Sequence, residues 1–331
     1  MKNNWLYAES GYLNFPEMVN HSATFNIVIG ARRTGKTYGA FKYYLNKDEK
    51  HIYMRRTASQ LDECCKDDLN PYSPFNCSVK KVGKYTGVVK DERENSRAIM
   101  LALSTISNIR GFNADAFTTI IFDEFIPEPL EVVRKGEGDA FLNAYETINS
   151  NRELQGKPPV KCWLLANSNT INNPITRALD VVNILAKMQA NGREYLLLKD
   201  RDLAIFCPQN SPISKRKKET ALHRLAKGTD FAKMAYDNEF IYDDFDDVGS
   251  LNIKQYNPIC IIGNSVIYRH KSECKYYVSR HKSGTVPLFA NNERGKKEFK
   301  SEYSYLFHQY IHQNFTFESY KNKIEFLEFF E

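Results

Sequence analysis

Runs of apolar residues, separated by polar or glycine-rich segments, divide the first two thirds of the chain into regular elements. Short, mostly apolar runs predict buried strands at 25–29, 51–56, 98–103, 118–122 and 161–166. Helical spacing is found at 36–45, 57–66 and 139–151, and residues 78–90 alternate around two glycines like a hairpin. Apolar strands separated by helices predict an α/β fold with a mostly parallel sheet covered on both faces.

The pattern changes after residue 206. Residues 211–227 form a basic stretch with helical spacing that ends at Gly228, and 231–240 predict a second short helix. The acidic run 243–249 ends in glycine and is expected to be a linker.

The last part of the chain predicts a separate small α+β unit at 250–331. Its expected elements are strands near 259–270, 276–281 and 286–290 and helices at 299–313 and 318–330. We therefore expect a large α/β domain at 1–206, a helical lid or linker at 207–249 and this unit as a third segment.

A glycine-rich turn follows the first strand. Residues 30–37 read Gly-Ala-Arg-Arg-Thr-Gly-Lys-Thr, the phosphate-loop pattern G-x-x-x-x-G-K-[ST] between a buried strand and a helix. Gly30 and Gly35 let backbone N–H groups face phosphate oxygens, Lys36 is expected to reach the β- and γ-phosphates, and the Thr37 hydroxyl is expected to ligate Mg²⁺. The other side chains expected at the nucleotide are Arg32, Arg33, Thr34 and Tyr38. The loop predicts a site for ATP with Mg²⁺.

Two acids close the strand at 118–122. Apolar and β-branched residues followed by Asp-Glu give the Walker B pattern. Asp123 is expected to hold Mg²⁺ and Glu124 to polarise the attacking water. An acidic turn is the alternative, but the phosphate loop earlier in the chain favours the catalytic interpretation.

An acid directly after the Walker B aspartate indicates the class of P-loop ATPases with an additional strand. In that class the next strand lies between the phosphate-loop strand and the Walker B strand, and 161–166 fits that place. Asn167 at its end is expected to face the γ-phosphate, although an ordinary turn asparagine is the alternative.

Two arginines are candidates for a cation supplied to a neighbouring subunit. Oligomeric motors often stabilise transition-state charge in this way. Arg152, just after the helix at 139–151, is the first candidate and Arg110 the second. A solvated surface charge is the alternative for both.

Composition narrows the class of protein. The 331 residues are 42% hydrophobic and 26% charged, as expected for a globular protein of two domains or one domain with an appendage. No apolar run has the length of a membrane span, and no signal-peptide core is visible at the N-terminus. Seven cysteines without a C-x-x-C pair indicate reduced thiols in a cytosol. The net charge of +6 permits a polyanionic partner.

In their order along the chain, several segments resemble phi29-type phage DNA-packaging ATPases, which are related to large terminase motors. These segments are 30–37, 52–56, 121–125, 151–153 and 224–241. The resemblance implies a homopentameric ring on the procapsid portal that translocates double-stranded DNA, with ATP sites between subunits. It implies a structural RNA partner in some members. It also implies a location in the host cytoplasm, transiently at the portal vertex and not in the mature virion.

The resemblance also implies roles for three arginines. The family's trans-acting arginine falls on Arg152. The position of its second trans-acting cation, a lysine, is occupied by Arg110, which keeps the charge but changes the hydrogen-bond geometry. Arg32 matches the early phosphate-loop arginine, which could follow the γ-phosphate or bind a neighbour.

The segment 250–331 is expected to be a vestigial RNase H-like nuclease domain. Two-metal cleavage needs clustered carboxylates, chiefly aspartates on strands. This segment contains no aspartate, and its 12 Lys and Arg against 8 Glu give a local charge of +4. We therefore expect no nuclease activity, and a surface suited to gripping phosphates, RNA or the portal.

Three other functions remain open from the sequence. A phosphoryl-transferring kinase shares the phosphate loop, a nucleotide-dependent assembly switch would bind without turnover, and a packaging terminase could retain its nuclease. The basic run 215–218 could lie on a lid or a DNA channel, or could be a solvated helix face.

Overall fold

The structure is a computed structural model that describes residues 4–47, 49–109, 114–128, 131–134, 136–209, 211–229, 232–233, 240, 243–281 and 284–331. The chain forms two compact units. The first comprises Met1–Leu179 and Met188–Tyr242, and the second comprises Asp180–Lys187 and Asp243–Glu331. The units are defined by compactness, so the three functional segments suggested by the sequence stay a prediction.

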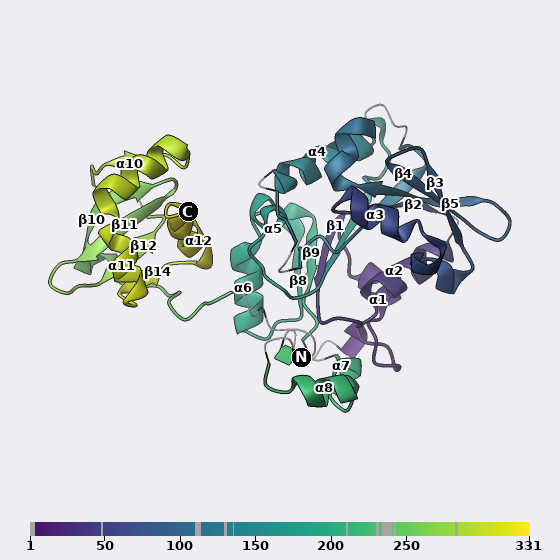
Figure 1. Ribbon diagram of the computed structural model, residues 1–331, viewed down its shortest axis with the longest axis horizontal. Helices are drawn as coiled ribbons and strands as arrows, with labels where there is room; N and C mark the ends of the chain where they lie inside the picture. Colours follow the sequence, from purple (N-terminus) through teal and green to yellow (C-terminus); the bar gives the residue numbers. More distant parts are fainter. Residues whose placement is uncertain are drawn as a thin grey trace. The chain divides into compact units, whose positions relative to one another are not determined.

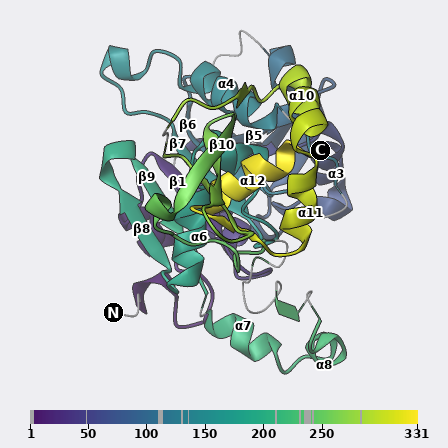
Figure 2. The ribbon, with the colours of Figure 1, turned by 90° about the vertical axis from the view of Figure 1, so that its left-hand side faces the viewer.

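The first unit is built on a nine-stranded sheet within the described residues, in the order β3-β4-β5-β2-β6-β7-β1-β9-β8. Its strands are β1 (Phe25–Ile29), β2 (Lys50–Arg55), β3 (Ser78–Val82), β4 (Thr86–Lys90), β5 (Ser96–Ala102), β6 (Phe117–Asp123), β7 (Lys161–Ala166), β8 (Tyr195–Leu198) and β9 (Leu203–Phe206). The six strands from β5 to β9 in this order run parallel, and the ends of the sheet are antiparallel. Figure 2 shows β8 and β9 beside β1.

β7 lies between β6 and β1, the place that the sequence analysis predicted for the strand at 161–166. β7 pairs in parallel with β6 on one side and with β1 on the other. The strand that ends in Asp123 and the strand that leads into the phosphate loop are thus separated by one strand. Because all three run parallel, their carboxyl ends meet at one edge of the sheet, where ligands of open α/β sheets bind.

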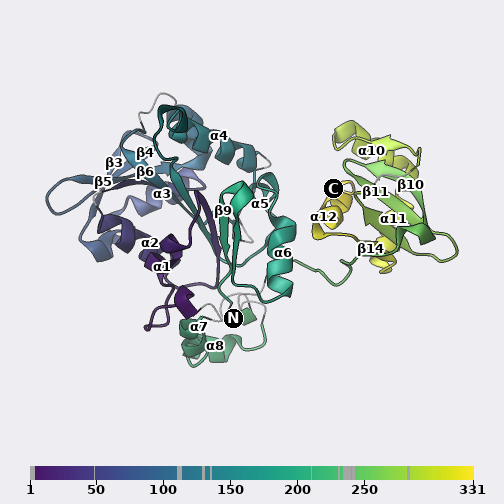
Figure 3. The ribbon, with the colours of Figure 1, turned by 180° about the vertical axis from the view of Figure 1, so that it is seen from behind.

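Helices cover both faces of this sheet (Figures 1 and 3). The helices of the first part of the chain are α1 (Phe15–Asn20), α2 (Lys36–Leu45), α3 (Ala58–Cys64), α4 (Glu137–Asn149), α5 (Pro174–Ala178) and α6 (Val182–Ala190). Residues of α1, α2 and α3 share a core with one face of the sheet, centred on the fully buried Trp163. On the opposite face, Phe141 of α4 stacks on Phe122 of β6 with ring centroids 5.9 Å apart. Each such buried aromatic side chain contributes about 1.5–3 kcal/mol by leaving water.

Two helices begin at residues whose side chains cap them. Thr57 caps α3 in a reciprocal capping box with Gln60. Asn173 caps α5, and Pro174 occupies its first turn, where a missing N–H costs nothing. Short 3₁₀ turns lie at Asn4–Leu6, Asp67–Leu69, Ser73–Phe75, Leu103–Ile109, Glu153–Gln155, Lys199–Arg201 and Ile253–Gln255.

Residues 4–24, before β1, have a defined structure that the sequence pattern did not predict. The N–H of Ala8 donates to the carbonyl of Tyr12 (2.9 Å), and Tyr7 bridges to Leu13. The N–H of Leu13 then donates to the carbonyl of Thr34 in the phosphate loop (3.0 Å). The bond from Leu13 to Thr34 joins segments distant in sequence, so no local period predicts it.

The basic stretch at 211–227 is two short helices, not the single helix expected. α7 (Pro212–Lys217) and α8 (Ala221–Ala226) are separated by a turn, and the Thr220 side chain accepts from the N–H of His223 to cap α8. Threonine favours such caps over helix interiors, which explains the break. The helix expected at 231–240 lies almost entirely outside the described residues.

The second unit contains a five-stranded sheet within the described residues, in the order β13-β10-β11-β12-β14. Besides residues 182–187 of α6, its elements are β10 (Tyr256–Ile262), β11 (Ser265–His270), β12 (Tyr276–Ser279), β13 (Leu288–Phe289), α10 (Glu293–Tyr303), α11 (Tyr305–Ile311), β14 (Phe315–Phe317) and α12 (Tyr320–Glu328). The single strand expected at 259–270 is a hairpin that turns at Gly263, whose φ of +52° suits glycine. The helix expected at 299–313 is likewise two helices. The RNase H-like identity of this unit stays a prediction.

The acidic run at 243–249, expected to be a linker, packs within the second unit. The Tyr320 hydroxyl donates to Asp243 (2.6 Å), and the buried ammonium of Lys323 donates to Asp244 (3.1 Å) and Asp247 (2.8 Å). Val248 bridges to Phe317 of β14. Two charges of the expected linker, those of Asp244 and Asp247, are therefore paired with a buried lysine.

Candidate nucleotide-binding site

The phosphate loop connects β1 to α2, as the sequence predicted. Gly35 caps α2 with φ +92°, and Arg33 also has a left-handed backbone, with φ +56°. Gly30 is required for a different reason, because a Cβ there would lie 2.8 Å from Cγ of Pro208. The first N–H groups of α2 have no partner within the helix and carry its positive dipole end, so the loop is built to receive an anion.

Lys36 is a buried cation held at the mouth of this loop. Its Nζ donates to the carbonyl oxygens of Gly30 and Ala31, both at 2.8 Å, and to Oδ1 of Asn167 at 3.1 Å. Burial lowers the pKa of the Lys36 ammonium to about 7, and the Asp123 carboxylate opposes that shift. A triphosphate would supply the negative charge that this buried ammonium lacks.

Thr37 and Asp123 form an oxygen pair suited to a hard cation. The Thr37 hydroxyl donates to Oδ1 of Asp123 at 2.9 Å, and the Tyr53 hydroxyl donates to Oδ2 at 3.2 Å. Burial raises the pKa of Asp123, and the charge of Arg55 opposes this. A hydroxyl and a carboxylate beside a phosphate loop are the donor set that Mg²⁺ takes with nucleotide phosphates, so these residues fit the metal.

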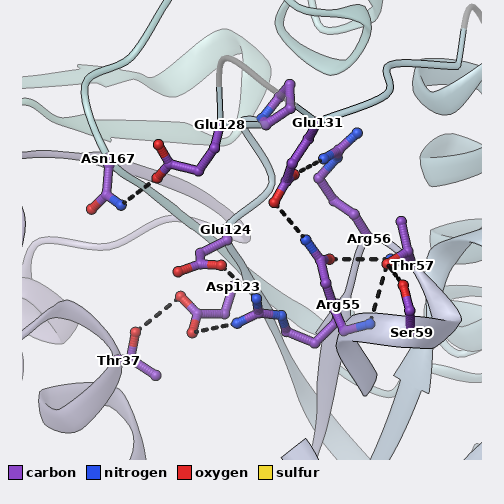
Figure 4. Close-up of polar contacts among 12 residues, drawn as sticks. Thr37, Arg55, Arg56, Thr57, Ser59, Asp123, Glu124, Glu128, Glu131 and Asn167 are labelled. Carbon is purple, nitrogen blue, oxygen red and sulfur yellow. Dashed lines mark hydrogen bonds and ion pairs between the residues drawn. The ribbon is translucent and has the colours of Figure 1, made fainter. Parts of the chain in front are cut away.

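Glu124 is paired with an arginine that the sequence analysis did not select. The Arg55 guanidinium is ion-paired with Glu124 and lies 3.7 Å from Oδ2 of Asp123 (Figure 4). Glu124 has φ +54°, a backbone conformation rare for a side chain of this kind and common at functional sites. Arg55 ends β2, which pairs with β6. Its position beside the Walker B acids follows from the strand order. The feature of the sequence that could have indicated this residue is the pair of arginines, Arg55 and Arg56, at the end of an apolar strand.

A second polar chain links the loop to the segment after the Walker B strand. Nδ2 of Asn167 donates to Glu128 at 3.3 Å, and Arg32 donates to the other oxygen of Glu128 at 2.6 Å. Asn167 also accepts from Lys36. Asn167 and Arg32 thus lie at the loop as expected, whereas Glu128 was not anticipated. Figure 4 shows Glu128 and Asn167 facing each other beside the Walker B acids.

These groups surround one pocket of about 330 Å³. It is lined by Arg32, Arg33, Thr34, Gly35, Lys36, Thr37, Tyr38, Asp123, Glu124, Glu128, Ala166 and Asn167. Of the predicted side chains, Thr34 is buried and turned inward, since its hydroxyl donates to the carbonyl of Ala31 (3.0 Å). Tyr38 is exposed at the rim.

The structure does not bring Arg152 to this pocket. The guanidinium of the buried Arg152 donates to the carbonyls of Pro158 (3.0 Å) and Asp115 (3.2 Å). These two residues precede β7 and β6, so Arg152 lies at the amino ends of the strands, and the pocket lies at their carboxyl ends. Arg110 lies outside the described residues.

Within the part of the chain that the structure describes, no group of three or more His, Cys, Asp or Glu is arranged to hold a metal ion, and no helix has the length and apolarity needed to span a membrane. The seven cysteines are not in disulfides.

Most of the chain matches one family of known proteins. Residues 7–257 match the family described as podovirus DNA encapsidation protein (Gp16). The DNA packaging protein of Bacillus phage phi29 is 28% identical over 250 residues, covering 71% of this chain and 68% of that protein. The DNA packaging protein of Bacillus phage B103 is 28% identical over 252 residues, covering 68% and 67%.

The fold has a counterpart among solved structures. A chain of the bacteriophage phi29 viral genome packaging motor assembly superimposes with a TM-score of 0.67 over 96% of this chain and 98% of that chain, at 19% identity. At this identity the likeness concerns the fold alone. It extends over both units, including residues 258–331, beyond the family match.

Proposed function

The chain belongs to the podovirus DNA encapsidation protein (Gp16) family, and from this premise we propose that it is an ATP-driven motor that moves double-stranded DNA into a preformed procapsid. The observation that carries the proposal is the convergence of Lys36, Thr37, Asp123 and Glu124 on one pocket at the carboxyl edge of the sheet. Phosphate binding, metal binding and water activation are thereby available within one site.

The roles follow from the contacts. Backbone N–H groups of the loop and the Lys36 ammonium bind the triphosphate, and Thr37 and Asp123 would hold Mg²⁺. When bound, Mg²⁺ neutralises charge on the phosphate oxygens. Glu124 orients the attacking water and accepts its proton once its carboxylate is released from Arg55. Asn167, which bonds both Lys36 and Glu128, transmits the presence of the terminal phosphate to the segment after β6.

We place Arg152 in the site of a neighbouring subunit of a homomeric, pentameric ring. The support is the match of Arg152 to the trans-acting arginine of phi29-type packaging ATPases; its guanidinium is buried here and donates to the carbonyls of Pro158 and Asp115, so it must be released to reach a neighbour. An arginine from a neighbour stabilises charge in the transition state and makes hydrolysis depend on assembly. Arg110 is kept as a second trans-acting candidate on sequence grounds alone.

DNA, the portal and a packaging RNA are the partners of the proposal. The net charge of +6 suits sequence-independent contacts to phosphates, which weaken as salt rises. The second unit is proposed to grip without cutting, since β10 carries no Asp or Glu. DNA cleavage that depends on Mn²⁺ would contradict this part.

Hydrolysis stimulated by DNA tests the central proposal. The full-length protein should release inorganic phosphate from ATP faster in the presence of double-stranded DNA of any sequence, and Lys36→Ala should abolish this release. Transfer of phosphate to an acceptor would indicate a kinase instead. Tight ATP binding without any turnover, with or without DNA, would indicate an assembly switch.

A further inference from the structure

Tyr53 is a buried residue beside the pair of Thr37 and Asp123, and the function proposed above gives it no role. It comes from the middle of β2, which pairs with β6 so that Tyr53 lies opposite Ile121, two residues before Asp123. Its hydroxyl donates to Oδ2 of Asp123 at 3.2 Å. A buried tyrosine needs a partner for its hydroxyl, and here the partner is the carboxylate expected to hold Mg²⁺.

The Tyr53 hydroxyl has one hydrogen, and its neighbours decide where that hydrogen points. Nη1 of Arg55 donates to the Tyr53 oxygen at 3.2 Å. Because a guanidinium donates and cannot accept, the hydrogen of Tyr53 is directed to Asp123. Thr37 donates to the other carboxylate oxygen, Oδ1, at 2.9 Å. Each oxygen of Asp123 is thus held by one hydroxyl, and the two bonds together fix the orientation of the carboxylate.

The position of the Tyr53 hydroxyl is set by the packing of its ring. The ring meets Phe41 of α2 edge to face with the centroids 5.2 Å apart, and it meets Tyr72 in the same way at 5.9 Å. Phe41 is four residues after Thr37 on α2, so the two lie on the same face of that helix. Tyr53 therefore connects β2 to α2, which supplies one hydroxyl to Asp123, and to β6, which ends in Asp123.

The same hydroxyl separates a fixed positive charge from the carboxylate. Nη1 of Arg55 lies 3.7 Å from Oδ2 of Asp123, beyond hydrogen-bond distance, and donates to Tyr53 instead. Thr37 and Arg55 lie on opposite sides of the carboxylate (Figure 4). A guanidinium bonded directly to Asp123 would form a strong charge-assisted bond and compete with a metal ion for the same oxygens.

We propose that Tyr53 is a positioning residue for the metal, whose hydroxyl orients the Asp123 carboxylate beside Thr37 and keeps Arg55 from binding that carboxylate in place of Mg²⁺. Residues that hold a metal ligand in this way change metal affinity by about 10–100-fold when they are replaced. The inference rests on the nucleotide site proposed above. It gives Tyr53 no contact with the nucleotide or with the metal.

Binding of a non-hydrolysable ATP analogue with and without metal tests this role. Isothermal titration calorimetry on the full-length protein measures the affinity for AMP-PNP in excess Mg²⁺ and in excess EDTA. Mg²⁺ should strengthen binding to the unaltered protein. Tyr53→Phe keeps the ring and its packing. In this variant the gain from Mg²⁺ should shrink about tenfold or more, whereas the affinity in EDTA should stay the same.

The matched control is Tyr72→Phe. Tyr72 is also buried in the core shared with α2, and its hydroxyl lies 2.9 Å from Nε2 of His51, with which it pairs instead of Asp123. This variant also loses one buried hydroxyl, and it should keep the full gain from Mg²⁺.

Two results would overturn the role of Tyr53. One is a full gain from Mg²⁺ in Tyr53→Phe, whether or not binding is weaker in both conditions. The other is an equal loss of that gain in Tyr72→Phe. If the unaltered protein bound the analogue equally well in Mg²⁺ and in EDTA, the metal site itself would be wrong. If it bound the analogue in neither condition, the nucleotide site would be wrong as well.

Discussion

The Arg55 guanidinium is ion-paired with the Glu124 carboxylate, and the same guanidinium lies 3.7 Å from Oδ2 of Asp123. The side chain of Arg55 is 12% exposed, so the pairing takes place largely out of water. The residue proposed to activate water is thus ion-paired with a cation of its own subunit. The metal and the terminal phosphate must enter a site whose charges are already balanced.

We expect Arg55→Met to destabilise the nucleotide-free protein by about 3 kcal/mol, because two neighbouring carboxylates lose their partner. Urea unfolding measures this loss. Saturating Mg-ATP should restore more stability to the variant than to the unaltered protein, since the metal supplies positive charge. Arg294→Met removes an exposed, solvent-screened pair with Glu298 and should leave the urea midpoint almost unchanged. Equal losses in the two variants would contradict the importance of the Arg55 pair.

Glu124→Gln should bind Mg-ATP normally and lose turnover by about a hundredfold or more, because the amide cannot accept a proton from water. Packaging of DNA should be lost together with turnover. The measurements are calorimetric binding, phosphate release and protection of packaged DNA from nuclease. Glu146→Gln, an exposed acid of α4, is the control. Packaging that survives without turnover would favour the assembly switch.

Arg152→Ala should reduce DNA-stimulated turnover by about a thousandfold if the arginine acts on a neighbour. In mixtures with unaltered protein, activity should fall more steeply than the variant's share if the sites of one ring fire in turn, because one disabled site then stops the whole ring. The exposed Arg93→Ala is the control. A loss proportional to the variant fraction would count against coordinated firing, and turnover that is independent of protein concentration would count against shared sites. Thermal unfolding of the variant measures the stability lost with the hydrogen bonds to Pro158 and Asp115. This measurement separates a structural effect of the substitution from an effect on hydrolysis.

Lys217 predicts a pH dependence of stability. Burial, with a contribution from Arg33, lowers the pKa of its ammonium to about 8, below its ordinary value of 10.5. Between these two values the unfolded chain binds more protons, so the lysine's contribution to the free energy of unfolding becomes more favourable as pH rises. Urea unfolding at pH 7.5 and pH 10 should show this gain relative to Lys217→Met, whereas Lys215→Met should track the unaltered protein. A pH-independent difference would refute the shift.

Gly138→Ala should destabilise the first unit by about 1–3 kcal/mol through overpacking. A Cβ there would lie 2.5 Å from the carbonyl oxygen of Pro174 and 2.6 Å from Cβ of Ala178. Gly136→Ala, two residues earlier, meets nothing within 4 Å and should cost less, about what an N-cap glycine gives over alanine. Denaturant midpoints of the two variants test this. An equal effect would mean that α4 and α5 can move apart.

The sequence was most informative where residues with a known chemical role stand directly beside a segment whose hydrophobic pattern predicts a strand or a helix. The phosphate loop, the two Walker B acids and the place of β7 between β6 and β1 follow from strings of neighbouring residues. The roles proposed for Glu124, Arg152 and Asn167 stay predictions. Arg55 and Glu128 could not be found in this way. Arg55 lies at the site because β2 is paired with β6, and Glu128 because the loop after β6 passes beside the phosphate loop.

Other differences come from single residues that end an element. Thr220 divides the basic stretch into α7 and α8, and Gly263 folds one apolar run into a hairpin. The basic run also proved not to be uniform, since Lys217 faces the phosphate loop while Lys215 and Arg216 are exposed. Charge alone does not show which member of such a run is turned inward.

The central place of β1 has a consequence for synthesis on the ribosome. β1 is among the first strands to be translated, yet its two neighbours in the sheet are β7 and β9, which end at residues 166 and 206. At about 5–20 residues per second, the phosphate-loop strand waits roughly ten seconds or more for its partners. During that time its apolar residues and unpaired edges are open to wrong associations. A lower growth temperature, or co-expression of a chaperone, should therefore raise the yield of active protein more than substitutions of surface residues.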